Sequence, residues 1–186
     1  MIPLCDQRLG KFVRSYSKAH MLRKLLFFSF LAGVLSCTPY HEDYYLETRY
    51  RPVLMDRSDL EESIAFLPPQ EQRAYGKIYR QDNLLFINEP FLGVHVVDNS
   101  DPRQPKKLGF IRIPGNIDIA MKGNYLYADN AVDLITLRWE GNGITVTDRN
   151  REVFPEYGPP DGEYVPSEYQ QANRPPNTVI IKWEEK

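Results

Sequence analysis

Cysteine is scarce in this chain of 186 residues, with copies only at Cys5 and Cys37. A disulfide-stapled scaffold and a Cys-rich zinc site are therefore excluded. The sequence also lacks a G-x-S-x-G nucleophile motif, a phosphate-binding loop and a dinucleotide fingerprint. These absences predict a protein without catalytic, cofactor-binding or metal-binding residues, and we do not expect it to be an enzyme.

An excess of basic residues is lacking outside the N-terminal segment, where acids outnumber Lys and Arg. Residues 1–36 hold six Lys and Arg side chains and one acid, a net charge of +5, whereas the whole chain has −2. The remainder therefore carries −7. Because nucleic-acid partners require a basic face, this acidic body argues against one.

Long hydrophobic runs are lacking too. Leu25 to Leu35 is an eleven-residue apolar run that follows the basic segment Met21-Leu22-Arg23-Lys24. Such a run is too short to span a bilayer as a helix, but it fits the apolar region of a signal peptide. Met21 would make a compact signal sequence by itself, so it could be the true start of the protein.

The apolar run ends in Val34-Leu35-Ser36-Cys37, which resembles the lipobox of bacterial lipoproteins. The resemblance implies cleavage before Cys37 and acylation of its thiol and new amino group, so that lipid chains anchor the protein to a membrane. A plain signal peptide, or a buried apolar strand with a chance cysteine, is the alternative.

The N-terminal signals define the predicted organisation of the chain. Residues 1–36 form the signal peptide, 37–52 a lipidated tether, 53–154 a β-blade domain, and 155–186 a Pro- and Tyr-rich loop with a terminal strand. Glu42 and Asp43 follow Cys37 closely, as in Bacteroidetes-type lipoproteins with an acidic export patch. We expect an outer-membrane lipoprotein of the bacterial cell envelope, facing the periplasm or the surface.

Short apolar runs separated by turn residues fill the middle of the chain. A pattern returns after 41 residues: it relates Asn83 to Asn124, Leu84 to Tyr125, Phe86 to Tyr127, Asn88 to Asp129, Val94 to Ile135 and Val96 to Leu137. A period near 40 with four strands per unit is typical of β-propeller blades. The predicted fold class is all-β, with about two four-stranded units: residues 77–80, 84–87, 93–97 and 107–113, then 118–121, 125–128, 133–137 and 144–147.

The segment Gly93 to Pro102, GVHVVDNSDP, together with Pro105, resembles the LVIVD repeat of bacterial surface proteins. The run from Arg51 to Phe154 is similar to the N-terminal part of Bacteroidetes LVIVD lipoproteins. The second unit departs from the motif, because Leu134 to Trp139 lacks the Asp and the Ser-Asp-Pro. The resemblance implies propeller-type blades and an envelope address, and it implies no reaction.

Two units are fewer than the roughly four blades that a propeller requires. Three outcomes follow: a truncated piece of a longer protein, a chain that pairs with another, or a small open β-sandwich. Of these we favour truncation, or a degenerate gene product. Around the repeat, Pro52 to Met55 predicts a short strand, and Ser58 with Glu61 predicts a capping box for a helix over 59–64. Residues 177–183 predict a last strand, which could begin a further blade.

A few side chains could carry chemistry. Asp98 to Asp101 offers oxygen ligands for calcium, but Asx residues before a proline more often set a turn. His95 is alone in mid-strand and is expected to be structural. Tyr125 and Tyr127 are expected to pack within the blade. The loop tyrosines Tyr157, Tyr164 and Tyr169 either stack against a glycan or peptide or pack against the blades.

These observations predict a lipid-anchored envelope protein whose β-blades act as a binding or scaffold module. Its expected partners are the membrane, through Cys37, and a glycan or an envelope protein. An envelope glycan-active enzyme and a non-functional fragment of a longer LVIVD protein are the alternatives.

Overall fold

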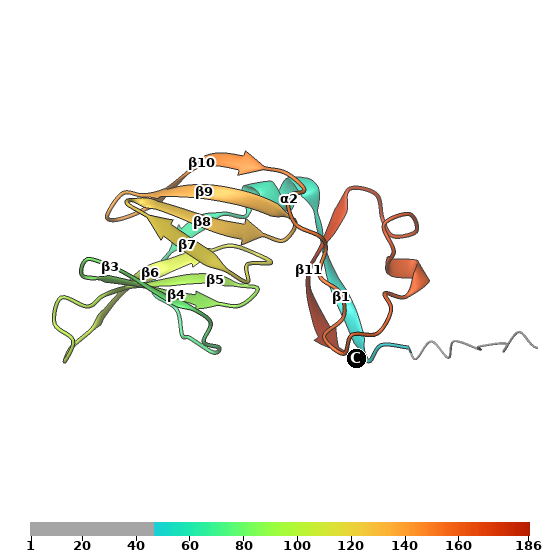
Figure 1. Cartoon of the computed structure of the whole chain (residues 1–186), viewed down its shortest axis with the longest axis horizontal. Helices are drawn as coiled ribbons and strands as arrows, with labels where there is room; N and C mark the ends of the chain where they lie inside the picture. Colours follow the sequence, from blue (N-terminus) through green and yellow to red (C-terminus); the bar gives the residue numbers. More distant parts are fainter. Residues whose placement is uncertain (1–46) are drawn as a thin grey trace, which may run out of the picture. The chain divides into compact units, whose positions relative to one another are not determined.

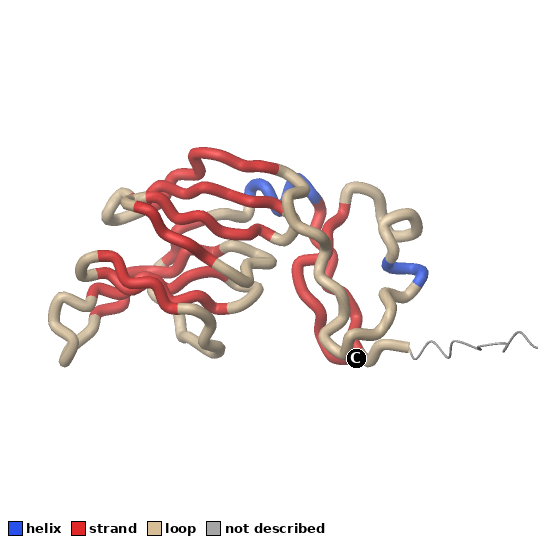
Figure 2. The backbone as a smooth tube through the Cα atoms, viewed as in Figure 1, coloured by secondary structure: helices blue, strands red, loops and turns tan. Residues whose placement is uncertain are grey.

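Short antiparallel strands make up nearly half of the chain that the computed structural model describes, residues 47–186 (Figures 1 and 2). The predicted all-β class with blade-like units is confirmed. The elements follow in the order β1 (Tyr50–Asp56), α2 (Arg57–Glu62), β2 (Ala65–Leu67), β3 (Ile78–Gln81), β4 (Leu84–Glu89), β5 (Gly93–Asp98), β6 (Lys106–Arg112), β7 (Ile119–Lys122), β8 (Tyr125–Asn130), β9 (Asp133–Trp139), β10 (Ile144–Asn150), the 3-10 helix η1 (Ser167–Tyr169) and β11 (Thr178–Glu185).

The first blade contains the strands predicted from the first repeat unit. Its strand order is β2-β6-β5-β4-β3, so that each strand from β3 to β6 pairs with its neighbour in sequence, and β2 adds to the edge. The turn between β3 and β4 contains Asp82, which has φ 51°. Aspartate tolerates this left-handed conformation better than most residues, which is why the predicted Asp-Asn turn forms here.

The second blade repeats this arrangement with the order β10-β9-β8-β7. The corresponding turn between β7 and β8 contains Gly123, with φ 56°. The predicted terminal strand is β11, but it does not begin a further blade. It pairs antiparallel with β1 in a separate two-stranded sheet.

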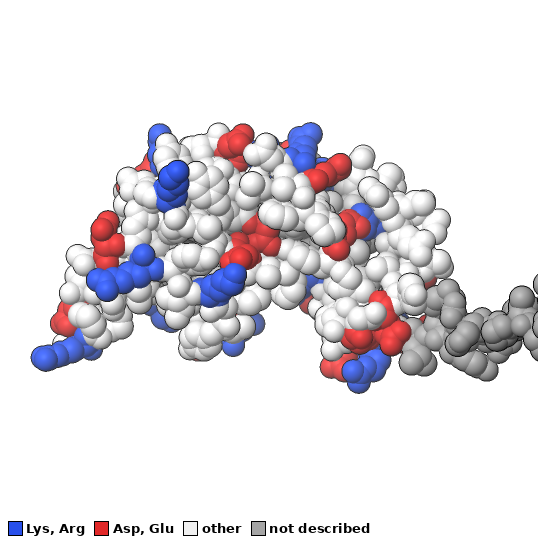
Figure 3. All heavy atoms as spheres, viewed as in Figure 1, with Lys and Arg blue, Asp and Glu red and all other residues white. Residues whose placement is uncertain are grey.

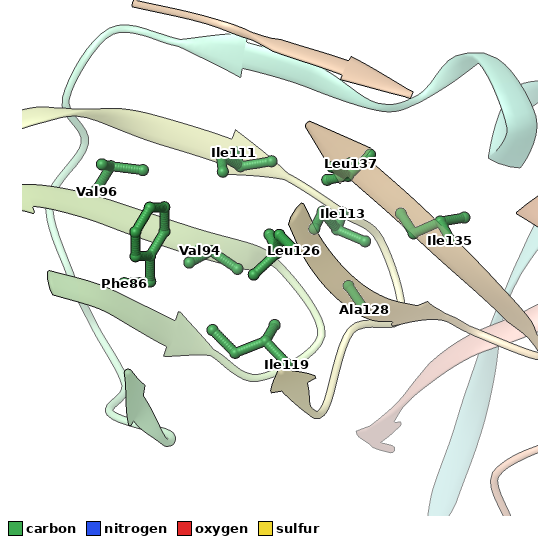
Figure 4. Close-up of a cluster of buried hydrophobic side chains, with 10 residues drawn as sticks. All are labelled: Phe86, Val94, Val96, Ile111, Ile113, Ile119, Leu126, Ala128, Ile135 and Leu137. Atoms are coloured by element: carbon green, nitrogen blue, oxygen red, sulfur yellow. The ribbon is translucent and has the colours of Figure 1, made fainter. Parts of the chain in front are cut away.

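The main core lies between the two blades, which pack face to face (Figure 4). Because side chains alternate along a strand, each blade directs one face into this core. The core consists of Phe86, Val94, Val96, Ile111 and Ile113 from the first blade and its exit, and Ile119, Leu126, Ala128, Ile135 and Leu137 from the second. Full burial of one such aliphatic side chain contributes about 1.5 to 3 kcal/mol.

The repeat offset is 41 residues in the first hairpin but 40 in the next strand. Leu84 and Tyr125 are equivalent because each directly follows the turn of its first hairpin, which gives an offset of 41. Phe86 pairs with Val96 and Tyr127 pairs with Thr136, so that Val96 is equivalent to Thr136, an offset of 40. The shift arises because three residues separate the paired Glu89 and Gly93, and only two separate Asn130 and Asp133. The expected pairs Val94–Ile135 and Val96–Leu137 are therefore wrong by one residue.

The second blade directs the other face of its β8 strand into the core. Leu126 and Ala128 enter the core, whereas Tyr125 is 41% exposed and Tyr127 is half-buried on the opposite face. Because neighbouring residues of a strand point to opposite faces, the tyrosines are directed away from this core. The expectation that both tyrosines pack within the blade is therefore wrong for Tyr125.

The predicted helix forms, but its N-terminus differs from the expected capping box. The helix α2 begins at Arg57, and Asp56 occupies the N-cap without a side-chain hydrogen bond. The amide of Arg57 donates instead to the carbonyl of Asn177 at 2.8 Å. Ser58 therefore lies inside the helix, and Glu61 forms ion pairs with Arg57 and Arg151.

Truncation of a core valine tests the face-to-face packing. We expect Val96→Ala to lower the free energy of unfolding by about 2 to 3 kcal/mol, because it removes two buried methyl groups and leaves a cavity. The matched change Val146→Ala lies on β10, where the side chain is 42% exposed, and should cost less than about 1 kcal/mol. Urea unfolding measures both, and equal costs would contradict the packing.

Candidate functional site

A groove of about 560 Å³ follows the edge strand β7 and extends over β8 and β9. We call it the β7 groove. Part of its wall is residues 154–158, which follow β10. Its lining is rich in aromatic and apolar side chains and includes three acids: Tyr79, Tyr127, Leu134, Phe154 and Tyr157, with Asp118, Asp129 and Glu156. Figure 3 shows how acidic and basic side chains are spread over one side of the molecule.

Asp129 is the most buried acid of the β7 groove. Its carboxylate accepts hydrogen bonds from the amides of Ile117 at 3.0 Å and Asp118 at 2.8 Å, and from the Asn116 side chain at 2.8 Å. The hydroxyl of Tyr157 donates to its other oxygen. Because these donors use the lone pairs of the carboxylate, Asp129 fixes the local backbone and is poorly placed to transfer protons.

Tyr157 joins the groove wall to the second blade. Burial and the hydrogen bond to Asp129 raise the pKa of Tyr157 well above its ordinary value, so the phenol stays protonated and keeps donating. Its ring also meets that of Phe91 edge to face, with centroids 5.9 Å apart. Of the two predictions for this loop tyrosine, packing against the blades is therefore confirmed.

The other two acids of the β7 groove also have partners. Asp118 forms an ion pair with the ammonium of Lys77 at 2.5 Å. Glu156 receives both terminal nitrogens of Arg174, one of them at 2.8 Å. Each carboxylate that lines this groove therefore has a hydrogen-bond or ion-pair partner in the described structure.

A second polar cluster surrounds Asp133, whose side chain is fully buried. Asp133 accepts from Arg57 at 2.8 Å and Arg149 at 2.6 Å, and Arg57 and Arg151 both pair with Glu61. This network ties α2 and β10 to the start of β9. It borders a cavity of about 580 Å³ that Arg57, Arg151 and Arg174 help to line. Each of these three guanidinium groups has a carboxylate partner among the described residues.

His95 has the structural role expected of it. It is buried, its Nε2 lies 2.6 Å from Glu89 Oε2, and its ring centroid is 4.7 Å from that of Phe110. Glu89 also accepts from the amides of Arg73 and Ala74. Burial tends to raise the pKa of Glu89, but the bonds from His95 and these amides outweigh it, so the pKa lies below its ordinary value.

The segment Asp98 to Asp101 uses its oxygens to hold a turn. Asp98 Oδ1 accepts from the amide and the hydroxyl of Ser100 at 2.9 and 2.5 Å, and Asp101 accepts from the amide of Arg103 at 3.0 Å. These are the local bonds of Asx turns. Across residues 47–186, no group of three or more His, Cys, Asp and Glu side chains is placed to hold a metal ion.

The remaining sequence candidates do not converge on one place. Tyr164 is 69% exposed and Tyr169 is half-buried, and neither is among the residues that line the β7 groove. Cys37, the predicted lipidation site, lies outside the described residues, as do the signal peptide and most of the tether. In the part of the chain that the structure describes, no helix is long and apolar enough to cross a membrane.

The pairing of Glu89 with His95 predicts a pH dependence of stability. Because the pKa of Glu89 is lowered from 4.5 in the folded state, its contribution is present above that pH and is lost as the pH falls through the folded pKa. We expect Glu89→Gln to cost about 1 to 3 kcal/mol near pH 7, and the difference from the natural protein to shrink below about pH 4.5.

Urea unfolding across this pH range measures the effect, with the exposed Glu71→Gln as the matched control. A difference between Glu89→Gln and the natural protein that stays constant with pH would contradict the assignment.

No family model, no curated protein and no solved structure matches this chain.

Proposed function

We propose that this chain is a lipid-anchored protein of the bacterial cell envelope, of the LVIVD repeat type, whose β-blades form a binding or scaffold surface. The lipobox-like sequence before Cys37 supports the anchor and an outer-membrane location. The two stacked blades, with the Asx turn that ends β5, support the repeat type.

The observation that carries the proposed role is the second blade's outer face, which is the face directed away from the core. Tyr125 and Tyr127 project from this face, and the β7 groove crosses it. The acids in that groove are all engaged, as described above, and the histidine of the first blade is buried against Glu89. A partly open face with two tyrosines, next to a groove whose described acids all have partners, is suited to binding, which is why we favour a binding or scaffold role over glycan hydrolysis.

The anchoring half of the proposal rests on a single thiol. We expect the natural chain to incorporate labelled palmitate and to fractionate with membranes, because acyl chains on Cys37 would bury their methylenes in one leaflet. Cys37→Ala should lose the label and leave the membrane fraction.

Cys5→Ala is the matched control, since Cys5 precedes the expected cleavage site, and it should behave as the natural chain does. Equal membrane association of Cys37→Ala and the natural chain would contradict the lipid anchor.

A further inference from the structure

Each blade has two faces, and the two faces that meet in the core are not equivalent to each other in the repeat. We call the face of a blade that contains Phe86 or its equivalents the leading face, and the opposite face the trailing face. The first blade contributes its leading face to the core, with Phe86, Val94 and Val96. The second contributes its trailing face, with Leu126, Ala128 and Leu137.

The leading face of the second blade is the structural equivalent of the one that packs in the core. Tyr125 and Tyr127 correspond to Leu84 and Phe86, because they follow equivalent turns. Leu134 and Thr136 then correspond to Val94 and Val96 through the pairing of the next strand. Residues 154–158 cover the end of this face near Asp129, where Tyr157 bonds. Tyr125, at the other end, is 41% exposed.

The trailing face of the first blade is likewise the equivalent of a face that packs. Ile78, Leu85 and Ile87 occupy the positions of Ile119, Leu126 and Ala128 in the second blade. Ile78 is 59% exposed, and Leu85 and Ile87 are only half-buried, whereas His95, Val97 and Phe110, on the β5 and β6 part of the same face, are buried. The segment before β3 covers the end near Glu89, where the amides of Arg73 and Ala74 bond to its carboxylate.

The parts of these two faces that stay open thus repeat part of the interface that the chain already forms between its blades. The covering segments sit on matching ends of the two blades, next to Asp129 and Glu89, and so leave matching ends open. The aliphatic side chains of the open trailing face and the tyrosines of the leading face resemble the core, where the Phe86 ring meets Trp139 among aliphatic side chains. The open ends differ from the core in charge, because Arg80 lies opposite Leu85, and Lys122 and Arg138 lie on either side of Tyr125.

We propose that a second copy of this chain stacks the trailing face of its first blade on the leading face of the second blade, so that copies associate head to tail. This rests on the proposed function, because it names the partner of the scaffold surface. Such a contact is heterologous and closes into a ring where the rotation permits. Two to four copies would supply the roughly four to eight blades of a closed propeller.

Disulfide trapping between two differently tagged copies tests the arrangement. Phe86 and Leu126 face each other's blade in the same core cluster, and their counterparts between copies are Tyr127 and Leu85. In a Cys5→Ser background, we mix full chains bearing Tyr127→Cys with full chains bearing Leu85→Cys, extract them in detergent and oxidise them. Mass spectrometry of the mixture should find a disulfide between the two introduced thiols, and neither variant alone should give a linked dimer through its new thiol.

The controls separate the other arrangements. Val153→Cys, at a residue 49% exposed in the loop after β10, should not link to Leu85→Cys. Self-linking of Tyr127→Cys would show a two-fold pairing and overturn the head-to-tail arrangement. Absence of the mixed link, with a single-chain mass in analytical ultracentrifugation, would overturn association altogether.

Two further variants guard against misfolding and a failed anchor. Ile78→Lys should shift the natural assembly to the single-chain mass while its circular dichroism stays unchanged, whereas Val153→Lys should leave the assembly intact. Cys37→Ala chains should still form the mixed link, because the stacked faces do not involve the anchor. A lost anchor with a retained link, and a retained anchor without a link, are therefore distinct results.

Discussion

The apolar contact between the two blades is the interaction on which the rest of this fold depends. A four-stranded sheet with one unpaired apolar face is marginal in water, because that face stays hydrated. Stacking removes the side chains of Phe86, Val94 and Val96 from water together with those of Leu126, Ile135 and Leu137. Neither blade buries these residues without the other, so the two must form as a unit.

Polar groups at the hairpin ends fix how the blades meet. Asn116, in the link between β6 and β7, accepts from the Asn88 side chain of the first blade and donates to Asp129 of the second. Gly115, beside it, has φ 74°, and a Cβ there would lie 2.8 Å from the backbone nitrogen of Ala131. This approach requires glycine, so the link can hold the two hairpins close together and let Tyr157 cap the cluster.

The sequence predicts the strands because they are bounded by strong turn residues. Asp82-Asn83 and Gly123-Asn124 adopt their turns through local preferences, so the hairpins and the all-β class follow from single segments. The faces could not be predicted in the same way. They depend on the length of the loop after Glu89 and on which face of each blade packs in the core. Local residue preferences determine neither of these.

The polar sites could not be predicted from the sequence either, for a related reason. Glu89, Asp129 and Asp133 look like ordinary strand-end residues. Asp129 and Asp133 bind Tyr157 and Arg57, which lie far along the chain, and Glu89 binds His95 across the blade. The one available signal was the 41-residue pairing of Asn88 with Asp129, two polar residues at equivalent positions of apolar strands. The capping box failed for the same cause, because the backbone of Asn177 satisfies the helix start in place of a side chain.

The stacking of the blades can be measured most directly at the contact between Phe86 of β4 and Trp139 of β9. Their ring centroids lie 5.9 Å apart in an edge-to-face arrangement. A double-mutant cycle on unfolding, with Phe86→Leu and Trp139→Leu, should give a coupling free energy of about 0.5 to 1.5 kcal/mol. Additive effects within about 0.3 kcal/mol would contradict the face-to-face packing of the two blades.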